Sequence, residues 1–159
     1  MTDRKSQLRQ TIEADDAASM AIFRRLTPEQ WESSVPSDEG AGWKARDVLA
    51  HVAVSESGQL TVIQRVLAGE GGVPADFDLN RYNRRAVQKQ AEHSVPEFLA
   101  GLERDHAQVL AALETVSEAD LDRTGRHARG DTLTVAQMFH RITEHRRQHA
   151  DELARNLER

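Results

Sequence analysis

Apolar residues recur at helical spacing in four long stretches of the chain. These stretches predict helices over about residues 6–26, 45–67, 95–116 and 134–157. In each, the apolar residues lie three and four positions apart, as one buried face of a helix requires. No stretch shows the sustained two-residue alternation of a half-buried strand. We therefore expect an all-α fold, and two longer connections between the helices favour an antiparallel four-helix bundle.

Capping residues mark where several of these helices begin. The segments 94–97 (SVPE) and 134–137 (TVAQ) pair a Ser or Thr with a Glu or Gln three residues later, which is the pattern of a capping box. The segment 27–30 (TPEQ) has the same pattern with a proline at the first helical position, so it predicts a short additional helix or a turn.

The connections are rich in glycine and polar residues. The segment 69–74 (GEGGVP) ends the second long helix, and residues 81–91 predict a mostly polar helical extension after it. Residues 33–42 form a loop of Ser, Gly and Pro. Residues 117–133 form a polar connection whose segment 124–131 (TGRHARGD) is a candidate mobile flap.

Composition narrows the classes of protein and of site. The length of 159 residues suits one domain, so we expect residues 1–159 to form a single bundle. The chain has no cysteine, which excludes disulfides, a cysteine nucleophile and thiolate metal sites. With 26 acidic against 21 basic residues and no long basic run, it is not expected to bind nucleic acid. It lacks an apolar stretch of membrane-spanning length and an N-terminal apolar signal core, so we expect no membrane partner and a cytoplasmic location.

Two histidines interrupt the apolar face of the last helix. The stripe through Phe139 and Ile142 continues to His145 and His149, which lie four residues apart and point the same way. Two imidazoles at this spacing form a common half-site for a divalent metal ion, whereas buried histidines without a metal each need a separate hydrogen-bond partner. Spacing alone leaves both interpretations open. Arg146 stands where an H-E-x-x-H protease motif would have its glutamate, so that motif is excluded.

A third ligand has to come from another helix, and two histidines compete for the role. His51 lies among apolar residues of the second long helix, where an unpaired imidazole is costly to bury. Asp47, four residues earlier, is a candidate partner for the other ring nitrogen of His51. His106 lies on the apolar stripe of the third long helix, and we favour a hydrogen bond to Asp15 or Asp16 for it over metal ligation.

The remaining histidines are expected to be structural. His93, His127 and His140 lie at a helix end, in a loop and on the last helix. For these three we favour an imidazole that is solvated or bonded to a backbone carbonyl.

Two segments resemble a known family. Residues 43–52 (WKARDVLAHV) resemble the start of the second helix of the DinB/YfiT-like family, and residues 144–149 (EHRRQH) are similar to the H-x-x-x-H of its final helix. The order and separation of the two segments fit as well. The resemblance implies a four-helix bundle in which His51, His145 and His149 hold a divalent metal, Zn²⁺ or Ni²⁺, with water completing the shell.

The same resemblance sets expectations about chemistry. The wider superfamily includes mycothiol-dependent maleylpyruvate isomerases, bacillithiol-linked transferases and colibactin-resistance hydrolases. It therefore implies a small-molecule substrate, a low-molecular-weight thiol as a candidate cofactor, and a homodimer.

The chain also departs from the pattern of its relatives, which leaves the substrate open. Residues 150–152 (ADE) replace a frequent R-G-Q, and Lys44 stands where Ser or Thr usually caps the helix. The related isomerases use Glu where this chain has His145, and the neighbouring Glu144 points about 100° away around the helix.

Three hypotheses about function follow. The first is a metal-dependent enzyme of the thiol-transferase, isomerase or hydrolase type, because a divalent ion on three neutral imidazoles acidifies a bound water or ionises a thiol. Its pocket would be lined by the 70–83 or 124–131 loop, with Asp47, Glu56, Tyr82 and Asn83 as candidate wall residues. The second is a non-catalytic metal- or small-molecule-binding bundle related to stress, with His106 as a candidate fourth ligand. The third is a bundle whose histidines only pack.

Overall fold

The structure, a computed structural model, describes residues 3–36 and 42–158. Four long helices and five shorter elements make up this part of the chain. In chain order they are α1 (Arg4–Arg25), α2 (Pro28–Trp31), α3 (Ala45–Leu67), α4 (Leu79–Lys89), α5 (Val95–Thr115), the 3₁₀ turn η1 (Asp120–Asp122), β1 (Thr124–Arg126), β2 (Thr132–Thr134) and α6 (Val135–Leu157). Half of the predicted 33–42 loop, residues 37–41, lies outside the described residues.

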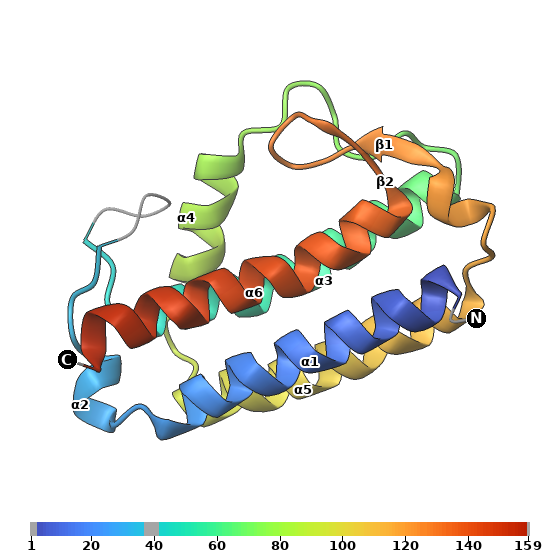
Figure 1. Ribbon diagram of the computed structural model, residues 1–159. Coiled ribbons are helices and arrows are strands. Elements are labelled where there is room, and N and C mark those ends of the chain that lie inside the picture. The colour runs from blue at the N-terminus through green and yellow to red at the C-terminus, as the bar shows by residue number, and fades with distance from the viewer. Residues whose placement is uncertain (1–2, 37–41, 159) are drawn as a thin grey trace.

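The four-helix bundle expected from the sequence is confirmed. Helices α1 and α3 each pack against both α5 and α6 (Figure 1). Two helices run each way: α1 and α6 point in one direction, and α3 and α5 in the other. The parallel pair α3 and α5 arises because the connection through α4 brings the chain back to the end of the bundle where α3 began.

Local sequence accounts for the helix starts. Thr134 Oγ1 accepts a hydrogen bond from the Gln137 backbone N–H at 3.1 Å, and the Gln137 side chain accepts one from the Thr134 N–H in return. The same reciprocal capping box opens α2 and α5. The short helix predicted at residues 27–30 is therefore confirmed as α2.

A short β-hairpin replaces the irregular 117–133 connection that we expected. Strand β1 pairs antiparallel with β2, and Gly125 stands opposite Leu133. The hairpin is fixed to the loop after α3, because the Arg126 backbone N–H donates to the Gly71 carbonyl at 2.9 Å. Strands of three residues are too short to show a two-residue period, so the pattern of the sequence did not predict them.

Two glycines allow the hairpin to approach so closely. A Cβ at Gly72 would lie 2.3 Å from the Arg126 carbonyl oxygen, and a Cβ at Gly125 would lie 2.3 Å from Val66 Cγ2. Any larger residue would therefore push the hairpin away from the bundle. The hairpin and α4 both lie on the side of α3 and α6 that faces away from α1 and α5 (Figure 1).

The core consists of two apolar clusters, one toward each end of the bundle. The first surrounds Phe23, Trp31 and Trp43, and the second surrounds Leu121 and Phe139. Each fully buried Leu, Ile or Phe contributes about 1.5–3 kcal/mol, so apolar packing supplies the bulk of the stability. In the part of the chain that the structure describes, no helix is long and apolar enough to cross a membrane.

Candidate metal centre

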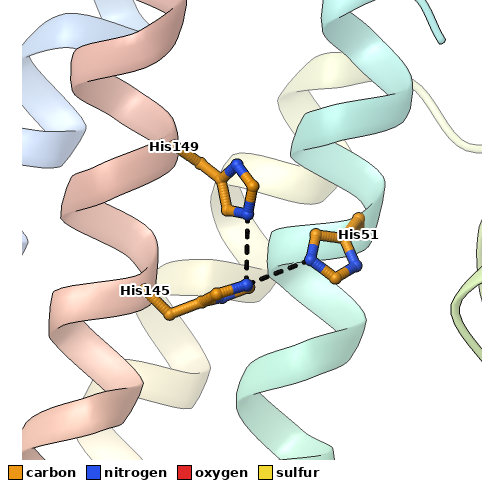
Figure 2. A group of neighbouring side chains, drawn as sticks. All are labelled: His51, His145 and His149. Atoms are coloured by element: carbon orange, nitrogen blue, oxygen red, sulfur yellow. Dashed lines mark hydrogen bonds between the residues drawn. The ribbon is translucent and has the colours of Figure 1, made fainter. Parts of the chain in front are cut away.

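Three imidazoles meet between α3 and α6. His51 Nε2 and His149 Nε2 each lie 3.1 Å from His145 Nε2 (Figure 2). His51 and His149 are buried, at 4% and 5% exposure, and His145 is half-buried. The three side chains form a group whose ligand atoms all lie within 4.8 Å of one another. The structure therefore brings together the three residues that the sequence singled out, and their role as metal ligands is proposed below.

The geometry of this triad suits a divalent ion better than hydrogen bonding alone. His145 Nε2 faces two nitrogens at the same 3.1 Å distance, but an imidazole nitrogen carries either one proton or one lone pair. It can therefore make a good hydrogen bond to only one of them. Two nitrogens bound to a tetrahedral zinc ion at about 2.0–2.1 Å lie roughly 3.3 Å apart, close to the spacing seen here. The donor set fits a borderline metal such as Zn²⁺ or Ni²⁺.

Neighbouring side chains hold two of the three rings. The Trp43 ring lies 5.5 Å from the His51 ring, centroid to centroid. Glu152 Oε2 lies 3.2 Å from His149 Nδ1, as in the carboxylate–histidine pairs that orient metal ligands. The sequence reasoning missed Glu152, although an acid three residues after a candidate ligand on a helix is a usable signal.

Asp47 has a different role from the one we predicted. Its Oδ2 accepts the backbone N–H of Lys44 at 2.9 Å, so it caps the start of α3. This contact is one half of a capping box. Lys44 has no side-chain acceptor for the other half, and the Asp47 N–H donates to the Lys44 backbone carbonyl at 3.0 Å instead.

A neighbouring face of α6 carries a buried ion pair that the apolar stripe did not predict. Arg146 is 1% exposed, and its guanidinium binds the Glu56 carboxylate with two hydrogen bonds and Asp16 with a third. It also donates to the Leu102 carbonyl at 3.3 Å. Glu56, which we expected in a pocket wall, instead lies in the core at 1% exposure.

Burial and charge oppose each other at this ion pair. Loss of hydration raises the pKa of Glu56 to about 7, although the adjacent Arg146 acts in the opposite direction. The pKa of Arg146 stays above its ordinary value because Glu56 and Asp16 outweigh its own burial. Arg146 is therefore a fixed positive charge inside the bundle.

The structure also tests the predictions made for the four histidines outside the triad. His106 Nδ1 lies 3.6 Å from Asp16 Oδ1, so Asp16 is the neighbouring acid, as we favoured, but the separation is longer than a hydrogen bond. It is not a fourth ligand, because the only group of three or more metal-capable side chains within residues 3–36 and 42–158 is the triad. His93 and His140 are exposed, as expected. The expectation for His127 is wrong, because its ring is buried and has no backbone carbonyl as a partner within the described chain.

A cavity of about 280 Å³ opens beside the triad. His51 and His145 line it, and further side chains of α3, α4, α6 and the hairpin loop complete its walls. The wall residues are Ser55, Gln59, Leu79, Asn83, His127, Ala128, Arg129, Arg141, Glu144 and Gln148. Both loops that we expected near the site therefore contribute, and so does Asn83. Tyr82 lines a separate hollow instead.

A second hollow of about 680 Å³ adjoins the first. The two share Asn83 and Arg129 among other wall residues, and His149 and Glu152 line the second. The triad thus faces open space on more than one side.

Comparison with known proteins identifies the family. The model of the DinB superfamily matches residues 11–153. This chain belongs to the DinB superfamily. The match spans both recognised segments, so the resemblance stated from the sequence is confirmed. A search of curated protein sequences found no match.

Solved structures share the fold at low identity. YfiT from Bacillus subtilis, described as a probable metal-dependent hydrolase with an unusual four-helix bundle topology, superposes with a TM-score of 0.73 at 20% identity, covering 97% of this chain and 87% of YfiT. A mycothiol-dependent maleylpyruvate isomerase superposes with a TM-score of 0.75 at 14% identity, covering 96% of this chain. This DinB chain spans only 63% of the isomerase's length.

A third similar structure concerns the expectation about nucleic acid. The colibactin self-resistance protein ClbS was solved in complex with double-stranded DNA, and it superposes with a TM-score of 0.75 at 13% identity, covering 98% of this chain and 95% of ClbS. That binding belongs to ClbS. For the present chain, whose net charge is −5, the expectation that it does not bind nucleic acid stays a prediction.

Proposed function

We propose that this DinB protein is a metal-dependent enzyme whose ion is held by His51, His145 and His149. The observation that carries the proposal is the convergence of three Nε2 atoms beside a cavity that His51 and His145 line. A purely structural metal site would be closed, whereas three protein ligands beside open space leave a position for a substrate.

The side chains around the triad support a catalytic role. Three neutral imidazoles leave the full charge of a divalent ion uncompensated, and such an ion, when bound, supplies Lewis acidity that lowers the pKa of a water or a thiol. Glu152 fixes the ring of His149, and Trp43 covers one side of His51. Asn83 presents an amide in the cavity wall, where it can orient a polar substrate.

We infer a reaction of the thiol-transferase, isomerase or hydrolase type. The chain contains no cysteine, so a transferred sulfur has to come from a separate low-molecular-weight thiol. The two adjoining hollows support this proposal, because they leave space for a thiol and a second molecule around one ion.

Metal analysis tests the proposal directly. Untagged protein is titrated with Zn²⁺ and Ni²⁺, and bound metal is measured by mass spectrometry after gel filtration. We expect one ion per chain in the wild type and none in the His149→Ala variant. Far-UV circular dichroism should show an intact helical bundle in that variant, because both apolar clusters remain.

The matched control is His140→Ala, an exposed histidine on the same helix. This variant should bind metal as the wild type does. Metal content well below one ion per chain after zinc addition would reject the proposed centre. Loss of helicity in His149→Ala would show that the triad is structural instead. A thermal-shift screen of the zinc-loaded protein against mycothiol, bacillithiol and glutathione then separates the thiol-dependent reactions from hydrolysis.

A further inference from the structure

The polar side chain of His127 is buried beside the triad cavity. It is 5% exposed, and among the described residues neither Nδ1 nor Nε2 has a partner. The Asp131 carboxylate lies 3.9 Å from Nδ1, which is too far for a hydrogen bond. Buried polar groups are nearly always paired, so an imidazole in this state calls for an explanation.

The backbone of His127, by contrast, is hydrogen-bonded at both its N–H and its carbonyl. Its N–H donates to the Asp131 carbonyl at 2.8 Å, and its carbonyl accepts the Gly130 N–H at 2.8 Å. One residue earlier, Arg126 exchanges backbone hydrogen bonds with Gly71 and Val73. The ring is therefore held in place by its loop and carried to the wall of the cavity beside the triad.

Arg141 of α6 lines the same cavity, and its guanidinium has N–H donors available to a ligand. Its guanidinium lies 3.5 Å from Asp131 Oδ2 and 3.8 Å from Glu144 Oε2, and it makes no hydrogen bond within the described chain. A guanidinium offers five N–H donors, so most of these remain available to a ligand. Burial, helped by the nearby Arg141, lowers the pKa of His127. The ring is thus neutral near pH 7 and presents one donor and one acceptor.

We propose that His127 and Arg141 together bind an anionic oxygen group, a carboxylate or a phosphate ester, of the small substrate in this cavity. The assignment rests on the proposed function, because the molecule held here is the one presented to the triad. A guanidinium and an imidazole N–H are both donors suited to a charged oxygen. The cavity volume of about 280 Å³ limits the occupant to a small molecule.

Calorimetric titration with simple probes tests this assignment. The probes are malonate, methyl phosphate and neutral malonamide, each added to zinc-loaded and to zinc-free protein. We expect one of the two anions to bind and malonamide to bind much more weakly. The preferred anion distinguishes a carboxylate substrate from a phosphate ester.

Variants in the cavity wall and elsewhere on the protein show which residues bind the anion. His127→Leu should weaken anion binding about ten- to hundred-fold, as expected for loss of a hydrogen bond to a charged group. His127→Gln keeps a donor and should recover part of the affinity, and the exposed His140→Leu should have no effect. Zinc content should be the same in all of them.

The outcomes separate this inference from the proposed function. Equal anion affinity in His127→Leu and the wild type, or equal binding of malonate and malonamide, overturns the inference even if zinc binds. Anion binding that depends on His127 in zinc-free protein supports it even if the metal centre is rejected. If His127→Leu fails to fold, the test uses the imidazole NMR signals of His127 in the wild-type protein. Signals that do not shift when the anion is added would also overturn the inference.

Discussion

The buried Arg146–Glu56 pair offers the sharpest test of how this bundle is held together. Replacing Arg146 with Met keeps most of the side-chain volume but leaves the Glu56 carboxylate, whose side chain is 0% exposed, without its cation. Removing one partner of a buried ion pair costs about 3–5 kcal/mol. A domain of this size has a free energy of unfolding of about 5–15 kcal/mol, so the variant should lose a large share of its stability.

The pH dependence of the same variant follows from the pKa of Glu56. A carboxyl group whose pKa rises from 4.5 to about 7 on folding binds more protons in the folded state, so stability falls as the pH rises through that window. Without Arg146, which acts to lower this pKa, the window extends to higher pH. Arg146→Met should therefore lose more stability than the wild type between about pH 5.5 and 8.

Urea unfolding followed by far-UV circular dichroism measures both effects. The double variant Arg146→Met, Glu56→Met removes the uncompensated charge and should regain most of the lost stability, since apolar replacement of a buried pair is often neutral. Two results would refute the reasoning: a single variant as stable as the wild type at pH 8, or a double variant no more stable than the single one.

Two further predictions concern the support of the site and the hairpin. Glu152→Gln should lower zinc affinity about 10–100-fold without changing the helical signal, because His149 loses its orienting carboxylate. Competition with a chromogenic chelator measures the affinity. An unchanged affinity would show that Glu152 does not support the site. Gly125→Ala should cost about 1–3 kcal/mol in urea unfolding, because its Cβ would lie 2.3 Å from Val66 Cγ2. Gly101→Ala is the matched control, because its Cβ meets only the Arg104 side chain at 3.7 Å. This change within α5 should stabilise the protein. A similar loss of stability in both variants would contradict the steric explanation.

Much of the fold could be predicted because its elements are long and their ends are marked. The segment predicted at 45–67 is α3 to the residue, and the capping boxes at 94–97 and 134–137 open α5 and α6. Helical periodicity over about twenty residues averages out single exceptions. The hairpin could not be predicted, because its strands are short and depend on contact with the loop at Gly72.

The three triad histidines could be singled out, but their surroundings could not. Periodicity finds one apolar stripe per helix, whereas α6 packs against α1 on one side and α3 on another, so it buries both Arg146 and His149. An arginine in such a position looks solvated from the sequence because its partners, Glu56 and Asp16, come from two other helices. His127 was misjudged for the same reason: the burial of a loop residue depends on what the loop packs against.

The sequence by itself determined that the chain forms four long helices, and that His145 and His149 share one face of the last, because helix geometry is local and repeats every 3.6 residues. Only the tertiary structure decided that His51 reaches these two rings, that a cavity opens beside them, and that His127 and Arg141 line its wall. Those relations join α3, the hairpin and α6. They depend on how the elements pack in space, which no local pattern along the chain encodes.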